Sequence, residues 1–132
     1  MAIVVDTSII IAVILNESSK PQLIQHTSNA ELIAPASLHW EIGNALSAMI
    51  KRKRLTLTEA HLALREYQKI ALRFYDVALD STMDVVAQYA LYAYDAYFIT
   101  CARLQSAPLL TLDHKLQTAA QAAGVTIIEV GS

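Results

Sequence analysis

Cysteine, glycine and proline are all scarce in this chain of 132 residues, and each scarcity excludes a class of protein. The single cysteine, Cys101, rules out an internal disulfide framework and is typical of a protein kept in a reducing compartment. Three glycines and three prolines are scattered along the chain, so no flexible linker or interdomain hinge is predicted. Because domains usually contain about 100–150 residues, we expect a single domain over residues 1–132.

An excess of either charge is also lacking. The 10 Lys and Arg residues stand against 12 Asp and Glu residues, which gives a formal net charge of −2. A general basic field that attracts nucleic acid is therefore absent, and any such contact requires a local patch. Hydrophobic residues make up 55% of the chain and charged residues 17%, a balance that argues against intrinsic disorder.

Long apolar runs are missing as well. The longest, from Ile9 to Leu15, is far shorter than the ~20 residues that span a bilayer. The N-terminal segment has no basic lead, and Asp6 interrupts its apolar stretch. We therefore expect a cytoplasmic protein without a membrane segment.

What the chain does contain is an alternation of strand and helix patterns. Short apolar runs bounded by polar residues or proline predict strands, and apolar residues at spacings of three and four predict helices. The alternation predicts an α/β fold, a three-layer α/β/α sandwich with a mainly parallel central sheet. We expect helices to begin at Ser37, Thr58 and Asp95. The expected strands are residues 3–5, 32–34, 74–79, 109–112 and 125–130.

Four carboxylates occupy settings that are unusual for charged residues. Asp6 and Asp113 directly follow predicted strands, Glu41 has small neighbours near the start of a helix, and Asp95 heads an apolar stripe. Each alone has an ordinary explanation, such as a helix N-cap or a turn. In a doubly wound parallel sheet, however, the strand ends and the following helix starts meet at one edge, where ligands bind. We expect the four side chains to meet at that edge.

Such a cluster requires protons or a cation. Two unit charges about 4 Å apart repel each other by roughly 4 kcal/mol at an effective dielectric constant near 20. Several such pairs exceed much of the net stability of a small domain. Oxygen ligands without histidine or cysteine favour the hard ions Mg²⁺ and Mn²⁺. Because such an ion activates water and stabilises charge on phosphate oxygens, hydrolysis of nucleic acid is the predicted chemistry.

These residues resemble the pattern of the PIN-domain family, over essentially the whole chain. Asp6-Thr7-Ser8 follows the first strand, and Asp95-Ala96 opens a late helix. The small size and the segment Asp95-Ala96-Tyr97-Phe98 look most like the VapC-type toxins of bacterial and archaeal toxin–antitoxin pairs. The other matching segments are Glu41-x-x-Asn44-Ala45-Leu46 and Thr111-x-Asp113.

The resemblance implies a PIN-like fold and an endoribonuclease that depends on Mg²⁺ or Mn²⁺ and whose water nucleophile leaves a 5′-phosphate. It also implies a homodimer, inhibition by a cognate antitoxin, and contact with operator DNA only through the antitoxin complex. Asp6 and Asp95 would be the main catalytic metal ligands. Glu41 and Asp113, the family's more variable acid, would bind the metal through water or orient the attacking water. The polar positions that would support these acids are Thr7, Ser8, Asn44 and Thr111.

Two other segments leave alternatives open. The basic run Lys51, Arg52, Lys53 and Arg54 would contact the RNA backbone or form a solvated helix end. The aromatic-rich stretch from Tyr89 to Phe98 would stack on bases, or pack in the core or in a dimer.

Two other functions would use the same acids. A receiver-like regulatory domain would accept a phosphoryl group at Asp6, but no acidic residue adjoins Asp6 and no Lys follows a late strand at the required place. A non-catalytic binding module would act only through a partner or operator DNA, and its idle carboxylate cluster would lower stability. A stable phosphoadduct would favour the receiver-like domain. A melting temperature that does not change when Mg²⁺ is added would favour the binding module.

Overall fold

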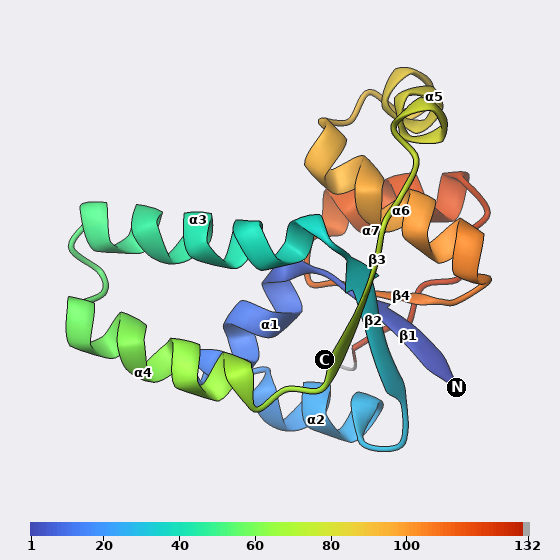
Figure 1. The fold of residues 1–132 in the computed structure, drawn as a ribbon. Helices are drawn as coiled ribbons and strands as arrows, with labels where there is room; N and C mark the ends of the chain where they lie inside the picture. The colour runs from blue at the N-terminus through green and yellow to red at the C-terminus, as the bar shows by residue number, and fades with distance from the viewer. Residues whose placement is uncertain (131–132) are drawn as a thin grey trace.

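A four-stranded parallel sheet forms the centre of the molecule in the computed structural model, which describes residues 1–130 (Figure 1). The strand order is β3-β2-β1-β4, and every neighbouring pair is parallel. The carboxyl ends of all four strands therefore lie at one edge, which we call the carboxyl edge. The strands are β1 (Ala2–Val5), β2 (Glu31–Pro35), β3 (Leu72–Tyr75) and β4 (Leu109–Leu110).

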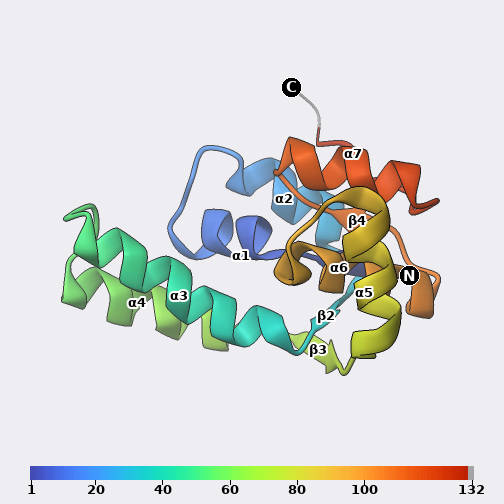
Figure 2. The same cartoon turned by 90° about the horizontal axis from the view of Figure 1, so that it is seen from above.

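The helices cover both faces of this sheet, which confirms the predicted α/β/α sandwich. Parallel strands are joined by right-handed crossovers. In the order β3-β2-β1-β4 the chain moves one way from β1 through β2 to β3 and then returns past β1 to β4, so the two sets of connecting helices lie on opposite faces of the sheet. Figure 1 shows α5, α6 and α7 grouped on one side of the sheet, and α1, α2 and α4 on the other; Figure 2 shows α3 and α4 running side by side away from it. The helices are α1 (Thr7–Ile14), α2 (Lys20–Thr27), α3 (Ser37–Lys51), α4 (Leu57–Gln68), α5 (Leu79–Tyr89), α6 (Ala93–Gln105) and α7 (His114–Ala122).

The core runs through the sheet from one helical layer to the other. Ile3, Val4 and Val5 of β1 are completely buried, as expected for a central strand with helices on both faces. Helix α6 packs on β1, β2, β4 and α5, and consecutive residues from Phe98 to Ala102 are buried. A helix that is buried on nearly all sides fixes the position of its first turn, and that turn carries Asp95.

Three of the predicted strands were wrong in their extent. The strand expected over residues 109–112 is only the two-residue β4, Leu109–Leu110. The third was expected over residues 74–79, but β3 ends at Tyr75 because its partner β2 ends at Pro35, which pairs with Tyr75. The last was expected over residues 125–130, where only an isolated bridge between Leu109 and Ile127 forms.

The predicted starts of three helices also need correction. Thr56 rather than Thr58 is the N-cap of α4, in a capping box in which the side chains of Thr56 and Glu59 accept from each other's backbone N–H. Ala36 rather than Ser37 is the N-cap of α3. Helix α6 begins at Ala93, so Asp95 lies within the first turn, where the helix dipole favours a negative charge.

Among residues 1–130, no helix is both long enough and apolar enough to cross a bilayer.

Gly43 lies on the exposed side of α3, and we expect the substitution Gly43→Ala to stabilise the protein by about 0.5–1 kcal/mol. A Cβ at this position meets no atom within 4 Å, so the gain in helix propensity is not offset by a clash. Thermal unfolding followed by circular dichroism measures the effect. Gly124→Ala is the matched control and should destabilise the protein, because Gly124 has a φ of +84°. A lower melting temperature for Gly43→Ala would contradict the prediction.

Candidate active site

The predicted acidic residues lie around the carboxyl edge of the sheet. Asp6 directly follows β1, and its backbone N–H donates to the carbonyl oxygen of Leu110 at 3.4 Å, which joins it to the end of β4. Glu41 lies in the first turns of α3, which follows β2. Asp95 lies in the first turn of α6, and Asp113 follows the end of β4.

Asp6 is the most buried of these acids, with only 5% of its surface exposed. Its Oδ1 accepts from the Ser8 hydroxyl at 2.6 Å and from the backbone N–H of Ile9 at 3.2 Å, which makes Asp6 the N-cap of α1. Its Oδ2 accepts from the Thr111 hydroxyl at 2.5 Å. Burial raises the pKa of Asp6 from its ordinary 3.8 to about 6, although these hydrogen bonds lower it and the charge of Asp113 raises it further.

The hydroxyls of Ser8 and Thr111 both donate to the Asp6 carboxylate and fix its orientation. The Ser8 hydroxyl also accepts from the backbone N–H of Leu112 at 3.0 Å, and the Thr111 hydroxyl accepts from the backbone N–H of Asp113 at 3.0 Å. These contacts link α1 to the segment after β4. The orientation of Asp6 is thus set by two chain segments that are distant in sequence.

Glu41 is half-buried on α3, and its pKa rises from 4.5 to about 7. Burial is the largest cause, followed by the negative charges of Asp95 and Asp6. The Ser37 hydroxyl donates to Glu41 Oε2 at 3.5 Å. Sequence reasoning had assigned Ser37 to a helix cap and missed this contact, although the spacing of four residues on one helix could have indicated it.

Asp95 and Asp113 complete the group with different degrees of exposure. Burial and the charge of Asp113 raise the pKa of Asp95, while Lys115 lowers it. Asp113 is exposed, and its Oδ1 accepts from the backbone N–H groups of Lys115 and Leu116 as the N-cap of α7. Asp113 thus has the ordinary role of a helix N-cap. It nevertheless lies close enough to Asp6 and Asp95 to raise the pKa of both.

The donor set fits a hard divalent cation. Both ion pairs found within residues 1–130, Lys69 with Glu66 and Arg73 with Glu31, leave the four acids without a cationic partner. The Thr7 hydroxyl oxygen is buried and has no hydrogen-bond partner, although it lies near enough to Glu41 to lower its pKa. Neighbouring carboxylates whose negative charges raise the pKa of Glu41 and Asp95 are stabilised by a positive charge.

The acids do not form a closed ligand shell by themselves. In the part of the chain that the structure describes, no three His, Cys, Asp or Glu side chains are gathered closely enough to enclose an ion. This arrangement suits Mg²⁺ better than a cation that requires an all-protein cage, because Mg²⁺ keeps several of its waters.

A cavity of about 410 Å³ opens beside Glu41. Asn44, predicted as a supporting residue, lines this cavity and lies one helical turn after Glu41. Two exposed aromatic side chains, Trp40 and Tyr94, also line it. Sequence reasoning had considered Tyr94 within the aromatic-rich stretch and had given Trp40 no role. Each directly precedes an acid in the sequence, which was the signal available for finding them. The remaining lining residues are Thr7 and Ala45.

The basic run Lys51–Arg54 lies at the opposite end of α3 from Glu41 (Figure 1). At a rise of about 1.5 Å per residue, Lys51 is roughly 15 Å along the helix axis from Glu41. The run therefore lies outside the acidic site, and its contact with RNA stays a prediction.

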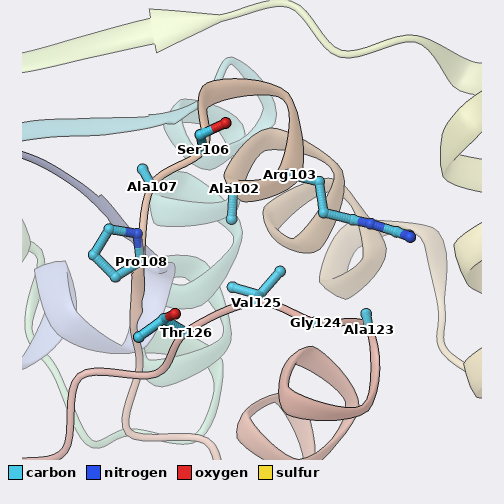
Figure 3. A pocket seen from close by; sticks show the side chains of 9 residues that line it. All are labelled: Ala102, Arg103, Ser106, Ala107, Pro108, Ala123, Gly124, Val125 and Thr126. Atoms are coloured by element: carbon cyan, nitrogen blue, oxygen red, sulfur yellow. The ribbon is translucent and has the colours of Figure 1, made fainter.

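A second cavity, of about 530 Å³, lies away from these acids (Figure 3). It lies at the start of β4, whereas Thr111 and Asp113 follow its end. Figure 3 shows Arg103 extending away from Pro108 and Thr126, and no carboxylate lines the cavity. Its lining comes from the end of α6, the loop before β4 and the segment after α7: residues 102–103, 106–108 and 123–126.

Comparison with known proteins finds relatives along most of the chain. The family model of the PIN domain matches residues 3–122. Ribonuclease VapC9 of Mycobacterium tuberculosis is 30% identical over 122 residues, which cover 91% of this chain and 92% of the relative.

Solved structures share the fold at lower identity. PAE2754 of Pyrobaculum aerophilum superposes with a TM-score of 0.70 at 22% identity, covering 90% of this chain and 79% of the other. VapBC2 of Rickettsia felis, bound to a DNA fragment from its promoter, gives a TM-score of 0.68 at 14% identity and covers 97% and 98% of the two chains.

Proposed function

The chain belongs to the PIN-domain family, and we propose that it is a metal-dependent endoribonuclease that acts as the toxin of a type II toxin–antitoxin pair. The observation that carries the proposal is the placement of Asp6, Glu41, Asp95 and Asp113 around one edge of the sheet, where Asp113 raises the pKa of Asp6 and Asp95, and these two raise the pKa of Glu41. A relative that is 30% identical and is named a ribonuclease supports the reaction class.

The chain's own residues would hold the reacting groups in place. Asp6 and Asp95 would bind Mg²⁺ or Mn²⁺, and Glu41 and Asp113 would contact it through water or orient the attacking water. The bound cation would offset the charges of the carboxylates and the phosphodiester and lower the pKa of water. Ser8 and Thr111 hold both oxygens of Asp6 in a fixed orientation, and Asn44 lines the same cavity as Glu41, where it would support that acid. Attack by water would leave a 5′-phosphate.

The proposed partners follow from the relatives. VapBC2 of Rickettsia felis was solved with promoter DNA, and the other neighbouring structures include FitAcB of Neisseria gonorrhoeae. We propose that this chain forms a homodimer as one PIN-like domain per copy, binds a cognate antitoxin, and reaches operator DNA only through that complex.

Neither alternative function has a specific contact in its favour. A receiver-like domain requires a lysine beside the phosphoryl-accepting aspartate, whereas neither ion pair within residues 1–130 involves Asp6. A binding module without turnover leaves the unpartnered Thr7 hydroxyl and the clustered acids unexplained.

Cleavage of RNA in the presence and absence of a divalent cation tests the proposal directly. The wild-type protein is expected to cleave with Mg²⁺ or Mn²⁺ and to stop when EDTA is added. Asp95→Asn should lose about a hundredfold or more of the activity. Asp80→Asn is the matched control, because Asp80 lies in the exposed first turn of α5 and should leave cleavage unchanged. Equal cleavage by wild type and Asp95→Asn would remove Asp95 from the site.

A further inference from the structure

Lys115 brings a positive charge to the acidic site. It lies two residues after Asp113 in the first turn of α7, a helix that begins at the carboxyl edge of the sheet. Burial and the charge of Asp113 raise the pKa of Asp95, and Lys115 acts against them. Among the Lys and Arg side chains of residues 1–130, no other affects the pKa of Asp6, Glu41 or Asp95.

The Lys115 ammonium group has no carboxylate partner. In the part of the chain that the structure describes, the two ion pairs join Lys69 with Glu66 and Arg73 with Glu31. Lys115 is exposed, so its charged end is accessible to a ligand. The ammonium group therefore acts on the acids as a nearby charge but is not held by any of them.

The rest of the Lys115 side chain lies against an apolar cavity. Lys115 lines this cavity of about 380 Å³ together with Tyr89, Leu91 and Ala119. Long basic side chains lay their methylene groups on such surfaces and keep the charged end in water. Leu91 lies two residues before the start of α6, and the first turn of α6 carries Asp95. The cavity thus keeps Lys115 beside the segment that carries this acid.

The stability of α7 does not explain a lysine at this position. The first turn of a helix is the positive end of its dipole, so a cation there is unfavourable. That turn contains no acidic residue, and Asp113 at the N-cap already accepts from the backbone N–H groups of Lys115 and Leu116. A side chain that disfavours its own helix and adjoins a candidate site is best explained by a ligand.

The charges of the site decide which ligand suits Lys115. Four ionised carboxylates keep a net negative charge even when one divalent cation is bound, so they repel a phosphodiester. An ammonium group is a compact charge that binds phosphate oxygens. The ligand that contacts both the acidic site and Lys115 is therefore anionic, and every linkage of the RNA backbone carries one negative charge.

We propose that Lys115 binds a non-bridging oxygen of one backbone phosphate of the RNA, within two nucleotides of the scissile bond, and so positions the strand against the acids. This inference rests on the proposed nuclease function and adds a substrate-positioning residue to it. Because the contact is made to the backbone, it contributes affinity that does not depend on the base sequence.

Binding of a fluorescein-labelled RNA oligonucleotide in EDTA, followed by anisotropy over a series of salt concentrations, tests the contact without cleavage. Lys115→Ala should raise Kd about 3- to 10-fold and reduce the slope of log K against log salt by about 0.7. Lys115→Arg keeps the charge and should bind within about twofold of wild type. Lys115→Ala should also melt at the wild-type temperature or above, since it removes a cation from the start of α7.

Lys69→Ala is the matched control for the change in net charge. Lys69 ends α4 just before β3 begins, so it lies at the edge of the sheet opposite to the acids. It should leave both Kd and the salt slope unchanged. Equal values for wild type and Lys115→Ala, or an equal loss in Lys69→Ala, would overturn the proposal.

Substrates in which one phosphate at a time is replaced by an uncharged methylphosphonate identify the phosphate. At one position near the mapped cleavage site, the methylphosphonate should raise the KM of wild type by the same factor as Lys115→Ala, with a smaller change in kcat. The same substrate should cost Lys115→Ala nothing further, because the contact is already lost. Losses that multiply at every position would overturn the proposal.

Two further outcomes separate this contact from other roles. If Lys115→Ala required more Mg²⁺ for cleavage but bound RNA in EDTA as tightly as wild type, Lys115 would act through Asp95 and the proposal would be overturned. A wild-type protein that binds RNA through Lys115 but does not cleave it would defeat the proposed nuclease function and leave the phosphate contact standing.

Discussion

Replacing Asp6 by Asn is expected to lower the rate of RNA cleavage about a hundredfold or more while the protein stays folded. Asp6 is the acid that the fold holds most firmly, since both of its carboxylate oxygens are fixed by hydroxyls from α1 and from the segment after β4. The introduced amide has the same shape and can still accept from the backbone N–H of Ile9, but it carries no charge for a cation. The loss should therefore appear in activity and in the response to Mg²⁺.

Two measurements separate this loss from simple unfolding. Without metal at pH 8, Asp6→Asn should melt at the same temperature as wild type or higher, because the ionised carboxylate is buried at a cost that the neutral amide avoids. Ser8→Ala keeps the charge and removes one hydroxyl donor, so it should lose only about tenfold in activity. If Asp6→Asn cleaved RNA at the wild-type rate, Asp6 would be a helix cap without a catalytic role.

The position of the acidic site could be predicted from the sequence because it depends on topology. Asp6 and Asp113 follow strands, and in a parallel sheet the ends of the strands share one edge. Glu41 and Asp95 stand in the early turns of helices that begin at this same edge. The hydroxyls of Ser8 and Thr111 were also predictable, since each lies two residues from an acid in the sequence.

Other features depend on contacts that a linear pattern does not contain. The end of β3 is set by Pro35 on the neighbouring strand, and residues 125–130 form only one bridge because β4 itself is two residues long. The bond from Ser37 to Glu41 requires that Ala36 take the place of the helix cap. The exposure of Trp40 could not be predicted, because a tryptophan usually buries most of its surface.

The metal-free protein is expected to be less stable at pH 8 than at pH 5. The folded state raises the pKa of Asp6 to about 6 and that of Glu41 to about 7, and it also raises the pKa of Asp95. In the unfolded chain these groups return to their ordinary values of 3.8 and 4.5, so the folded protein binds more protons between about pH 4 and pH 7. Their contribution to stability is therefore present below pH 4 and is lost as the pH rises through 6 and 7.

The rise in the pKa of Asp6 from 3.8 to about 6 corresponds to about 3 kcal/mol in total, of which only about half, roughly 1.5 kcal/mol, is lost between pH 5 and pH 8. Glu41 is half exposed, so solvent screening reduces its share. The pKa of Glu59 is lowered by its capping box, so its titration affects stability only below pH 4.5. Thermal unfolding in EDTA at pH 5 and pH 8 measures the difference.

Addition of Mg²⁺ should oppose the loss of stability between pH 5 and pH 8. The cation binds the ionised carboxylates and so stabilises the folded state by RT ln(1 + [Mg²⁺]/Kd). The increase in melting temperature on adding Mg²⁺ should therefore be larger at pH 8 than at pH 5. Asp6→Asn is the matched control, and it should show both a smaller loss of stability in EDTA and a smaller response to Mg²⁺. A metal-free melting temperature that rises from pH 5 to pH 8 would contradict the raised pKa values. A response to Mg²⁺ that is equal at both pH values would instead place the cation away from these acids.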